Sequence, residues 1–99
     1  MEIKVQSIHF DADKKLVDFI NGKVGKLNAM NDQITTGEVF LRLDKNEGGD
    51  NKIAEIKINV PGKELFAKRQ CKSFEEAVDL SVEALRTQIR KYKGKTVNR

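Results

Sequence analysis

The chain has 99 residues, a formal net charge of +4 and a hydrophobic content of 38%. This length gives one domain with one shared core, and the composition suits a soluble globular protein and excludes a disordered one. No apolar run approaches the ~20 residues needed to cross a bilayer, and the first residues lack the layout of a signal peptide. We therefore expect a cytoplasmic protein without a membrane partner, and the single cysteine, Cys71, agrees with a reducing compartment.

The N-terminal third predicts a strand followed by a helix. Ile3 and Val5 alternate with polar residues, the period of a half-buried strand. Either Asp11 or Asp13 can cap the helix that follows, and apolar residues at helical spacing extend it to about Asn28.

Three strands are predicted in the middle of the chain, at residues 38–43, 54–60 and 64–70. The polar stretch 44–52, with its Gly-Gly pair, is typical of a flexible hairpin loop. Pro61-Gly62 predicts a tight turn, because proline presets φ at its second position and glycine tolerates a positive φ at its third.

A long helix is predicted at the C-terminal end. Ser73 and Glu76 form a capping-box pattern at its start, and Lys93-Gly94 is expected to end it. Its apolar stripe consists of Val78, Val82, Leu85, Ile89 and Tyr92. The order β-α-β-β-β-α predicts an α+β fold, with a four-stranded, mostly antiparallel sheet and both helices on one face.

Positive charge is concentrated at the C-terminal end. The last fourteen residues carry six cations and no Asp or Glu, so subtracting six from the net +4 leaves the rest of the chain at −2. The helix macrodipole favours such an order, with acids first and cations last, but one or two cations would satisfy it. The excess makes nucleic acid the first partner to consider.

Two clusters of cations are candidates for phosphate contact. On the last helix, Arg86, Arg90 and Lys93 recur at i, i+4 and i+7 and form a basic ridge, whereas Lys91 points elsewhere. The first helix carries Lys15, Lys23 and Lys26 beside its apolar stripe. If the helices pack side by side, cations from both join in one basic surface. The alternative is that each cluster is only a solvated helix face.

Strand alternation assigns a mixed population to the open face of the sheet. Phe40 and Phe66 lie there among cations, and exposed aromatic rings beside cations can stack single-stranded bases. Glutamates are interleaved with them and no RNP-like motif is present, which favours an ordinary water-facing sheet. The cations expected on this face are Lys4, Arg42, Lys57 and Lys68.

The sequence offers no catalytic or metal-binding constellation. His9 is the only histidine and lies far in sequence from Cys71, and one His with one Cys cannot fill a tetrahedral metal shell. The glycines at residues 22–26 lie inside a helix pattern and lack the Walker spacing. We therefore expect no enzyme, no cofactor and no small-molecule substrate.

The element order, the Pro-Gly turn before Glu-Leu-Phe-Ala and the closing Gln-Ile-Arg-Lys-Tyr-Lys-Gly-Lys together resemble a known family. It is the ribosome hibernation promoting factor and ribosome-associated inhibitor family, also labelled sigma-54 modulation proteins. Residues 23–27 look like its Lys-x-x-Lys-Leu and residues 77–79 like its Ala-Ile-Asp. The resemblance implies a fold like that of double-stranded-RNA-binding domains, with one ribosome-binding domain at 1–95 and a short tail at 96–99. The chain ends four residues after Lys95, which favours the family's short form.

The resemblance also implies a function. Family members bind 16S rRNA in the mRNA and tRNA channel of the small ribosomal subunit, on the 70S ribosome, and inhibit translation in starved or stationary cells. Their rRNA-facing cations correspond by position to Lys23, Lys26, Lys91, Lys93 and Lys95; wheel geometry adds Arg86 and Arg90.

Departures and alternatives stand beside this expectation. Arg69 takes the place of a small residue on the core-facing side of the fourth strand, and Glu75 the place of a frequent aromatic. Two alternative functions are a free-standing double-stranded-RNA-binding module and a protein-interaction module that uses the open sheet face.

Overall fold

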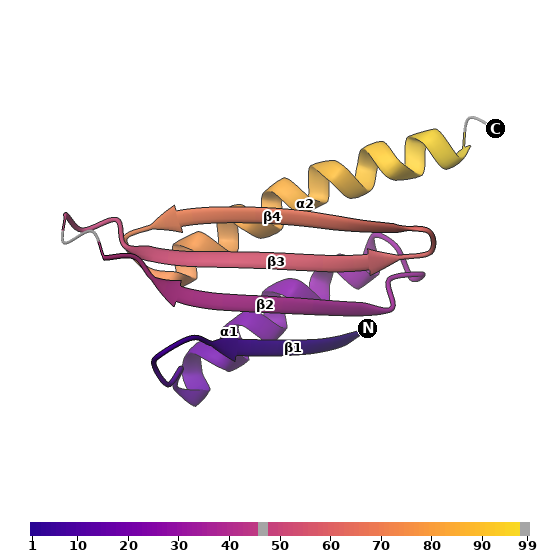
Figure 1. Cartoon of the computed structure of the whole chain (residues 1–99). Helices are drawn as coiled ribbons and strands as arrows, with labels where there is room; N and C mark the ends of the chain where they lie inside the picture. The colour runs from indigo at the N-terminus through magenta and orange to yellow at the C-terminus, as the bar shows by residue number, and fades with distance from the viewer. Residues whose placement is uncertain (46–47, 98–99) are drawn as a thin grey trace.

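The computed structural model describes residues 1–45 and 48–97, and describes side chains as far as Tyr92. The elements follow the predicted order (Figure 1). They are β1 (Glu2–Ser7), α1 (Lys14–Gly25), a short 3-10 helix η1 (Lys26–Ala29), β2 (Thr36–Leu43), β3 (Lys52–Val60), β4 (Lys63–Cys71) and α2 (Phe74–Val97).

The four strands form one sheet in the order β1-β2-β3-β4. β1 pairs with β2 in parallel, and the other two pairs are antiparallel. A parallel pair needs a crossover connection, which α1 and η1 supply between β1 and β2. Both helices lie behind the sheet in Figure 1, so the other face is open. The predicted α+β class, the mostly antiparallel sheet and the placement of the helices are confirmed.

The core lies between the sheet and the two helices. From α1 it receives Ile20 and Val24, and from α2 Val78, Leu85 and Ile89, all fully buried. One glycine sets a close approach: a Cβ on Gly37 would lie 3.2 Å from Ile58 Cδ1 and 3.6 Å from Val24 Cγ1. A side chain at position 37 would therefore press on Ile58 of β3 and, at the same 3.2 Å, on Met1 Sδ, and would reach Val24 of α1 at an ordinary contact distance.

The predicted helix starts and the predicted turn are present. Leu16 N donates to Asp13 Oδ1 over 2.9 Å, so Asp13 caps α1. Glu76 N donates to Ser73 Oγ over 3.1 Å at the start of α2. Gly62 takes a φ of +78°, the left-handed conformation that the turn between β3 and β4 requires of its glycine.

Two predicted helix ends were wrong. The first α-helix ends at Gly25, and its predicted last turn is the 3-10 helix η1. The last helix does not end at Lys93-Gly94 but continues to Val97. Glycine lowers helix stability by about 1 kcal/mol relative to alanine and does not by itself terminate a helix. Residues 98–99 of the predicted tail lie outside the described residues.

Arg69 does not disturb the sheet. β4 keeps an unbroken register with β3, in which Arg69 lies opposite Ala54. The side chain is exposed although its neighbours Ala67 and Cys71 on the same face are buried, and its Nη1 donates to the Lys68 carbonyl over 2.7 Å. The side chain can turn outward to solvent because β4 is an edge strand, with no further strand paired beside it.

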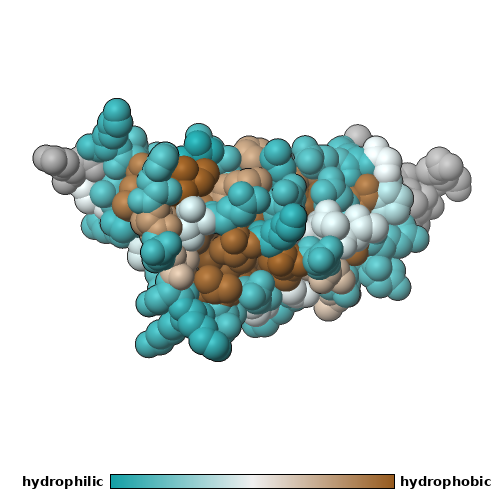
Figure 2. All heavy atoms as spheres, turned by 60° about the horizontal axis from the view of Figure 1, so that its bottom comes forward, coloured by the Kyte–Doolittle hydropathy of each residue, from teal (hydrophilic) through white to brown (hydrophobic). Residues whose placement is uncertain are grey.

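The β1 edge is covered incompletely. Ile3 and Val5 of β1 and Leu16 of α1 pack against the core but stay partly exposed. Figure 2, which brings this side of the molecule forward, shows hydrophobic surface in the middle of the view with hydrophilic side chains around it. Among the described residues no helix combines the length and the apolar character needed to span a membrane.

Candidate nucleic-acid interface

The two helices contact each other through an ion pair. Lys23 Nζ of α1 lies 3.1 Å from Asp79 Oδ1 of α2. The starts of the helices also meet, because the ring of Phe10, which precedes α1, stacks on the ring of Phe74, the first residue of α2, with centroids 5.0 Å apart. Both helices therefore start at the same end of the molecule and run in roughly the same direction behind the sheet (Figure 1). The second half of α2, with Arg86, Arg90 and Lys91, and the end of α1, with Lys23, point to the other end.

The basic ridge of α2 lies on the side that faces α1. Arg86 and Arg90 follow Asp79 by seven and eleven residues, about two and three helical turns, so they share the side that Asp79 marks. The opposite side of the helix is tied to the sheet: Gln88 Nε2 donates to Phe66 O, and the Tyr92 hydroxyl donates to Pro61 O, each over 2.8 Å. The ridge and the sheet contacts thus occupy different sides of α2.

The cations of α1 lie on the side that faces α2. Lys23 marks this side through Asp79, and Lys26 follows it by less than one turn at the start of η1. Lys15 precedes Lys23 by about two turns. Lys15 and Lys26 are exposed, whereas Lys23 is half-buried. The helices pack side by side, and the ion pair shows that the sides of α1 and α2 that carry Lys23 and Asp79 face each other. That the other cations join them in one basic surface stays a prediction from helix periodicity.

The seven candidate cations differ in their ion pairing. Lys26, Arg90 and Lys91 are exposed, and none has an ion-pair partner among residues 1–45 and 48–92. Lys23 is paired with Asp79, and Arg86 Nε lies 3.3 Å from Glu83 Oε2, in a geometry too poor for a hydrogen bond. Lys91 lies on the outward surface of α2, away from the ridge. The side chains of Lys93 and Lys95 lie outside the described residues.

Sequence reasoning missed one functional feature of this surface, the pairing of Lys23 with Asp79. Both residues belong to segments that carried the family resemblance: Asp79 to Ala-Val-Asp and Lys23 to Lys-Val-Gly-Lys-Leu. Nothing in a single sequence states that these two segments meet, because the two residues come from helices separated by three strands.

The open sheet face carries balanced charge. The register places four cations there, Lys4, Arg42, Lys57 and Lys68, together with four carboxylates, Glu2, Glu38, Glu55 and Glu64. Glu55 binds Arg42 through a hydrogen-bonded ion pair and lies 3.9 Å from Lys68 Nζ. Lys57 Nζ lies 5.8 Å from the centroid of the Phe40 ring. Two of the four cations, Arg42 and Lys68, are thus paired with Glu55, whereas Lys4 and Lys57 have no ion-pair partner among the described residues.

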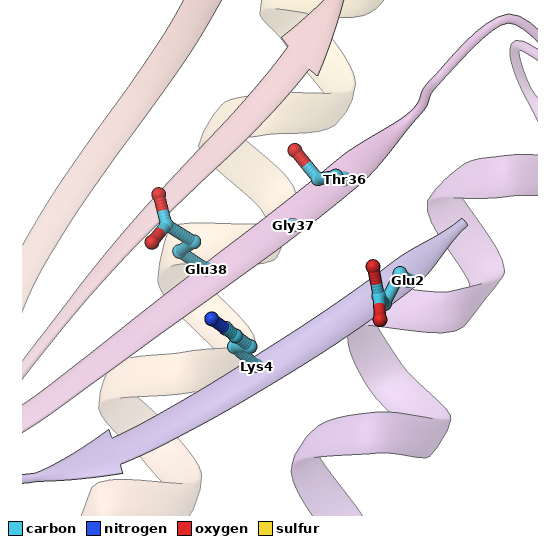
Figure 3. Close-up of a pocket in the computed structure, with 5 residues that line it drawn as sticks. All are labelled: Glu2, Lys4, Thr36, Gly37 and Glu38. Carbon is cyan, nitrogen blue, oxygen red and sulfur yellow. The ribbon is translucent and has the colours of Figure 1, made fainter.

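A shallow pocket on this face confirms its mixed character (Figure 3). It lies over β1 and β2, and Glu2, Lys4 and Glu38 project their charged groups around it. Thr36 and Gly37 complete its lining. Two carboxylates against one ammonium repel a polyanion, and the pocket contains no nucleophile with an adjacent base.

The two residues considered for catalysis offer no reactive arrangement. His9 is exposed in the loop after β1, with a φ of 67°. Burial raises the pKa of the Cys71 thiol, and the nearby carboxylates of Glu76 and Asp50 raise it further. A thiol with a raised pKa stays protonated and is a poor nucleophile at neutral pH. No group of three or more possible metal ligands occurs in the part of the chain that the structure describes.

Comparison with known proteins gives a consistent result. A family model described as "Sigma 54 modulation protein / S30EA ribosomal protein" matches residues 3–97. A ribosome hibernation promoting factor from Azotobacter vinelandii is 27% identical over 99 residues, which cover 100% of this chain and 89% of the relative. A protein of the same name from Pseudomonas putida is 23% identical over 95 residues, 96% of this chain and 89% of the relative.

Two solved structures have the same fold. A ribosomal subunit interface protein from Coxiella burnetii superposes with a TM-score of 0.85 at 23% identity, covering 95% of this chain and 99% of that one. The N-terminal domain of Thermus thermophilus Protein Y gives a TM-score of 0.79 at 23% identity, with 93% and 99% covered.

Proposed function

Because the chain belongs to the Sigma 54 modulation protein / S30EA ribosomal protein family, we propose that it is a ribosome-binding translation inhibitor of starved or stationary cells. Its partner is the small ribosomal subunit within the 70S ribosome, where it contacts 16S rRNA in the channel used by mRNA and tRNA. The names of the two relatives, ribosome hibernation promoting factor, support this proposal. A ribosomal partner places the protein in the cytoplasm.

The observation that carries the proposal is the opposed basic sides of α1 and α2. Lys26 and Arg90 have no ion-pair partner among the described residues, so phosphates can bind them without displacing a carboxylate. Phosphate contacts position a protein without reading sequence, so recognition follows the shape of folded RNA. The proposed rRNA-binding set is Lys23, Lys26, Arg86, Arg90, Lys91, Lys93 and Lys95, within one ribosome-binding domain at residues 1–95.

Inhibition needs no chemistry in this proposal. The shared core packs both helices against the sheet, so the folded domain is compact. A compact domain bound in the channel excludes mRNA and tRNA by volume alone.

Sedimentation of lysates from starved cells tests the proposal against a free-standing double-stranded-RNA module. We expect the protein to migrate with 30S and 70S particles in a sucrose gradient and to co-purify with 16S rRNA. A protein that binds duplex RNA in solution but stays at the top of the gradient would support the module instead. A protein that binds neither would contradict both readings.

A further inference from the structure

Lys23 differs from the other candidate cations in its surroundings. Its side chain is 35% exposed and that of Asp79 51%, with 3.1 Å between Nζ and Oδ1. The ammonium also lies 5.8 Å from the centroid of the Phe19 ring, one turn earlier on α1. Its stem is therefore packed and its charge is shared between a carboxylate of α2 and an aromatic face of α1. Lys26, three residues later, is exposed and has no such partner among the described residues.

Among the residues whose side chains the structure describes, this ion pair is the only hydrogen bond or ion pair between the two helices. Apolar residues such as Ile20, Val24, Val78 and Val82 anchor α1 and α2 to the shared core on their sheet-facing sides. Apolar contacts are non-directional, so they resist separation of two helices better than rotation of one helix about its axis. An ion pair on the outer side of the contact restrains that rotation.

We infer that Lys23 and Asp79 are positioning residues for RNA binding: their ion pair sets the spacing between the free cations of α1 and α2. This inference rests on the proposed function and assigns different roles to two lysines of one cluster. Within the proposed rRNA-binding set, Lys26 contacts phosphate directly. Lys23 contributes indirectly, because its ion pair with Asp79 holds α1 in position against α2. Asp79, an acid within a basic surface, then strengthens the binding of a polyanion.

The substitution Asp79→Asn separates this role from direct phosphate contact by the sign of its effect. If Lys23 binds phosphate directly, Asp79 competes for it, and Asp79→Asn tightens binding and steepens its salt dependence. If the pair positions α1, Asp79→Asn weakens binding although the protein gains a unit of positive charge. We expect a weakening of about threefold, within the range that a partly exposed ion pair contributes.

The experiment measures the Kd for purified small ribosomal subunits over a series of KCl concentrations. Lys23→Met, which keeps the stem, should weaken binding by about threefold with an unchanged salt slope. The matched control Lys26→Met, in the same cluster, should reduce the slope by about 0.8, the value for one lost phosphate contact. The swap of Lys23→Asp with Asp79→Lys should restore most of the affinity, because it re-forms the pair. A tighter or unchanged Asp79→Asn variant, or a reduced slope for Lys23→Met, would overturn the inference.

A measurement on the free protein tests the ion pair separately from the proposed ribosome binding. A double-mutant cycle on urea unfolding, with Lys23→Met and Asp79→Asn, measures the coupling of the pair in the free protein. If the wild-type protein ignores small subunits while the cycle shows coupling, the proposed function fails and the interhelical pair stands. If the cycle shows no coupling, the positioning role fails whatever the wild type binds.

Discussion

The helix surface and the open sheet surface of this domain both carry lysine and arginine, but they use the charge differently. On the sheet, four cations share one face with four carboxylates, and Glu55 serves both Arg42 and Lys68. In α2 the acids lie in the first half and the cations in the second half, and Lys23 and Lys26 lie at the end of α1 and the start of η1. Lys26, Arg90 and Lys91 consequently keep their full charge toward solvent.

We expect the pairing of cations to predict a polyanion site better than their number does. A cation that is already paired with a carboxylate contributes little free energy to phosphate binding, because the phosphate must displace the existing partner. A cation in water releases counterions when it binds nucleic acid, and this release favours association. We therefore expect substitutions on the two surfaces to have separable effects.

The largest expected effect comes from charge reversal on the helix surface. Arg90→Glu with Lys91→Glu should weaken binding to purified small ribosomal subunits by at least about 100-fold, because two phosphate contacts become repulsive. Lys4→Glu with Lys68→Glu makes the same change in net charge on the sheet and should alter Kd by less than about threefold. Equal losses for the two double variants would remove the distinction between the surfaces. A loss confined to the sheet variant would favour a protein-interaction or RNA site there.

A smaller effect is expected from Glu55→Gln on the sheet. The Glu55 side chain is only 13% exposed and serves two cations, so its loss should lower the free energy of unfolding by about 2 kcal/mol. Glu83→Gln removes an exposed carboxylate from the half-buried Arg86 on α2 and should lower it by only about 0.3 kcal/mol. Urea unfolding measures both. Binding to small subunits should stay unchanged in the Glu55 variant, and a clear gain would show that the sheet can bind RNA once its cations are released.

Ser81→Ala tests whether the stability of α2 and its binding can be changed separately. Ser81 is fully buried, and its hydroxyl has no hydrogen-bond partner among the described residues. Replacing an unsatisfied hydroxyl by hydrogen should raise the free energy of unfolding by about 0.5 to 1 kcal/mol. The measurement is the urea midpoint, and the Kd for small subunits should not change. A destabilised variant would mean that the hydroxyl does have a partner in solution.

The smallest effect concerns Cys71 and the pH dependence of stability. Burial raises the pKa of this thiol, so the folded protein holds the proton more tightly than the unfolded chain does. Its contribution to stability is complete below the unfolded pKa of about 8.5 and is lost as the pH rises through the folded value. Cys71→Ala should flatten the stability profile above about pH 8.5 relative to the wild type. Rapid reaction of the native thiol with a thiol reagent at neutral pH would contradict the raised pKa.

The local patterns of the sequence predicted most of the fold. The alternation of Ile3 and Val5, the Pro61-Gly62 turn and the Ser73 cap each identified an element that the structure contains. The helix ends were less predictable, because glycine at position 94 was expected to terminate a helix that continues to Val97. Propensity at one position is weak beside the preferences of a whole helix.

The candidate site was predictable in part. Wheel geometry identified the ridge with Arg86 and Arg90, and two helices on one face predicted that the clusters would meet. Helical periodicity could not identify the pairing of Lys23 with Asp79, because this pairing depends on tertiary contact between distant segments. The charge of Lys23 alone did not distinguish a phosphate ligand from an interhelical contact.

The central claim is that unpaired cations on opposed sides of α1 and α2 bind the RNA of the small ribosomal subunit. The salt dependence of wild-type binding to purified small subunits tests it most directly. With about five phosphates neutralised, the logarithm of the binding constant should fall against the logarithm of the salt concentration with a slope of about −4. A slope near zero, or no binding at low salt, would contradict the claim.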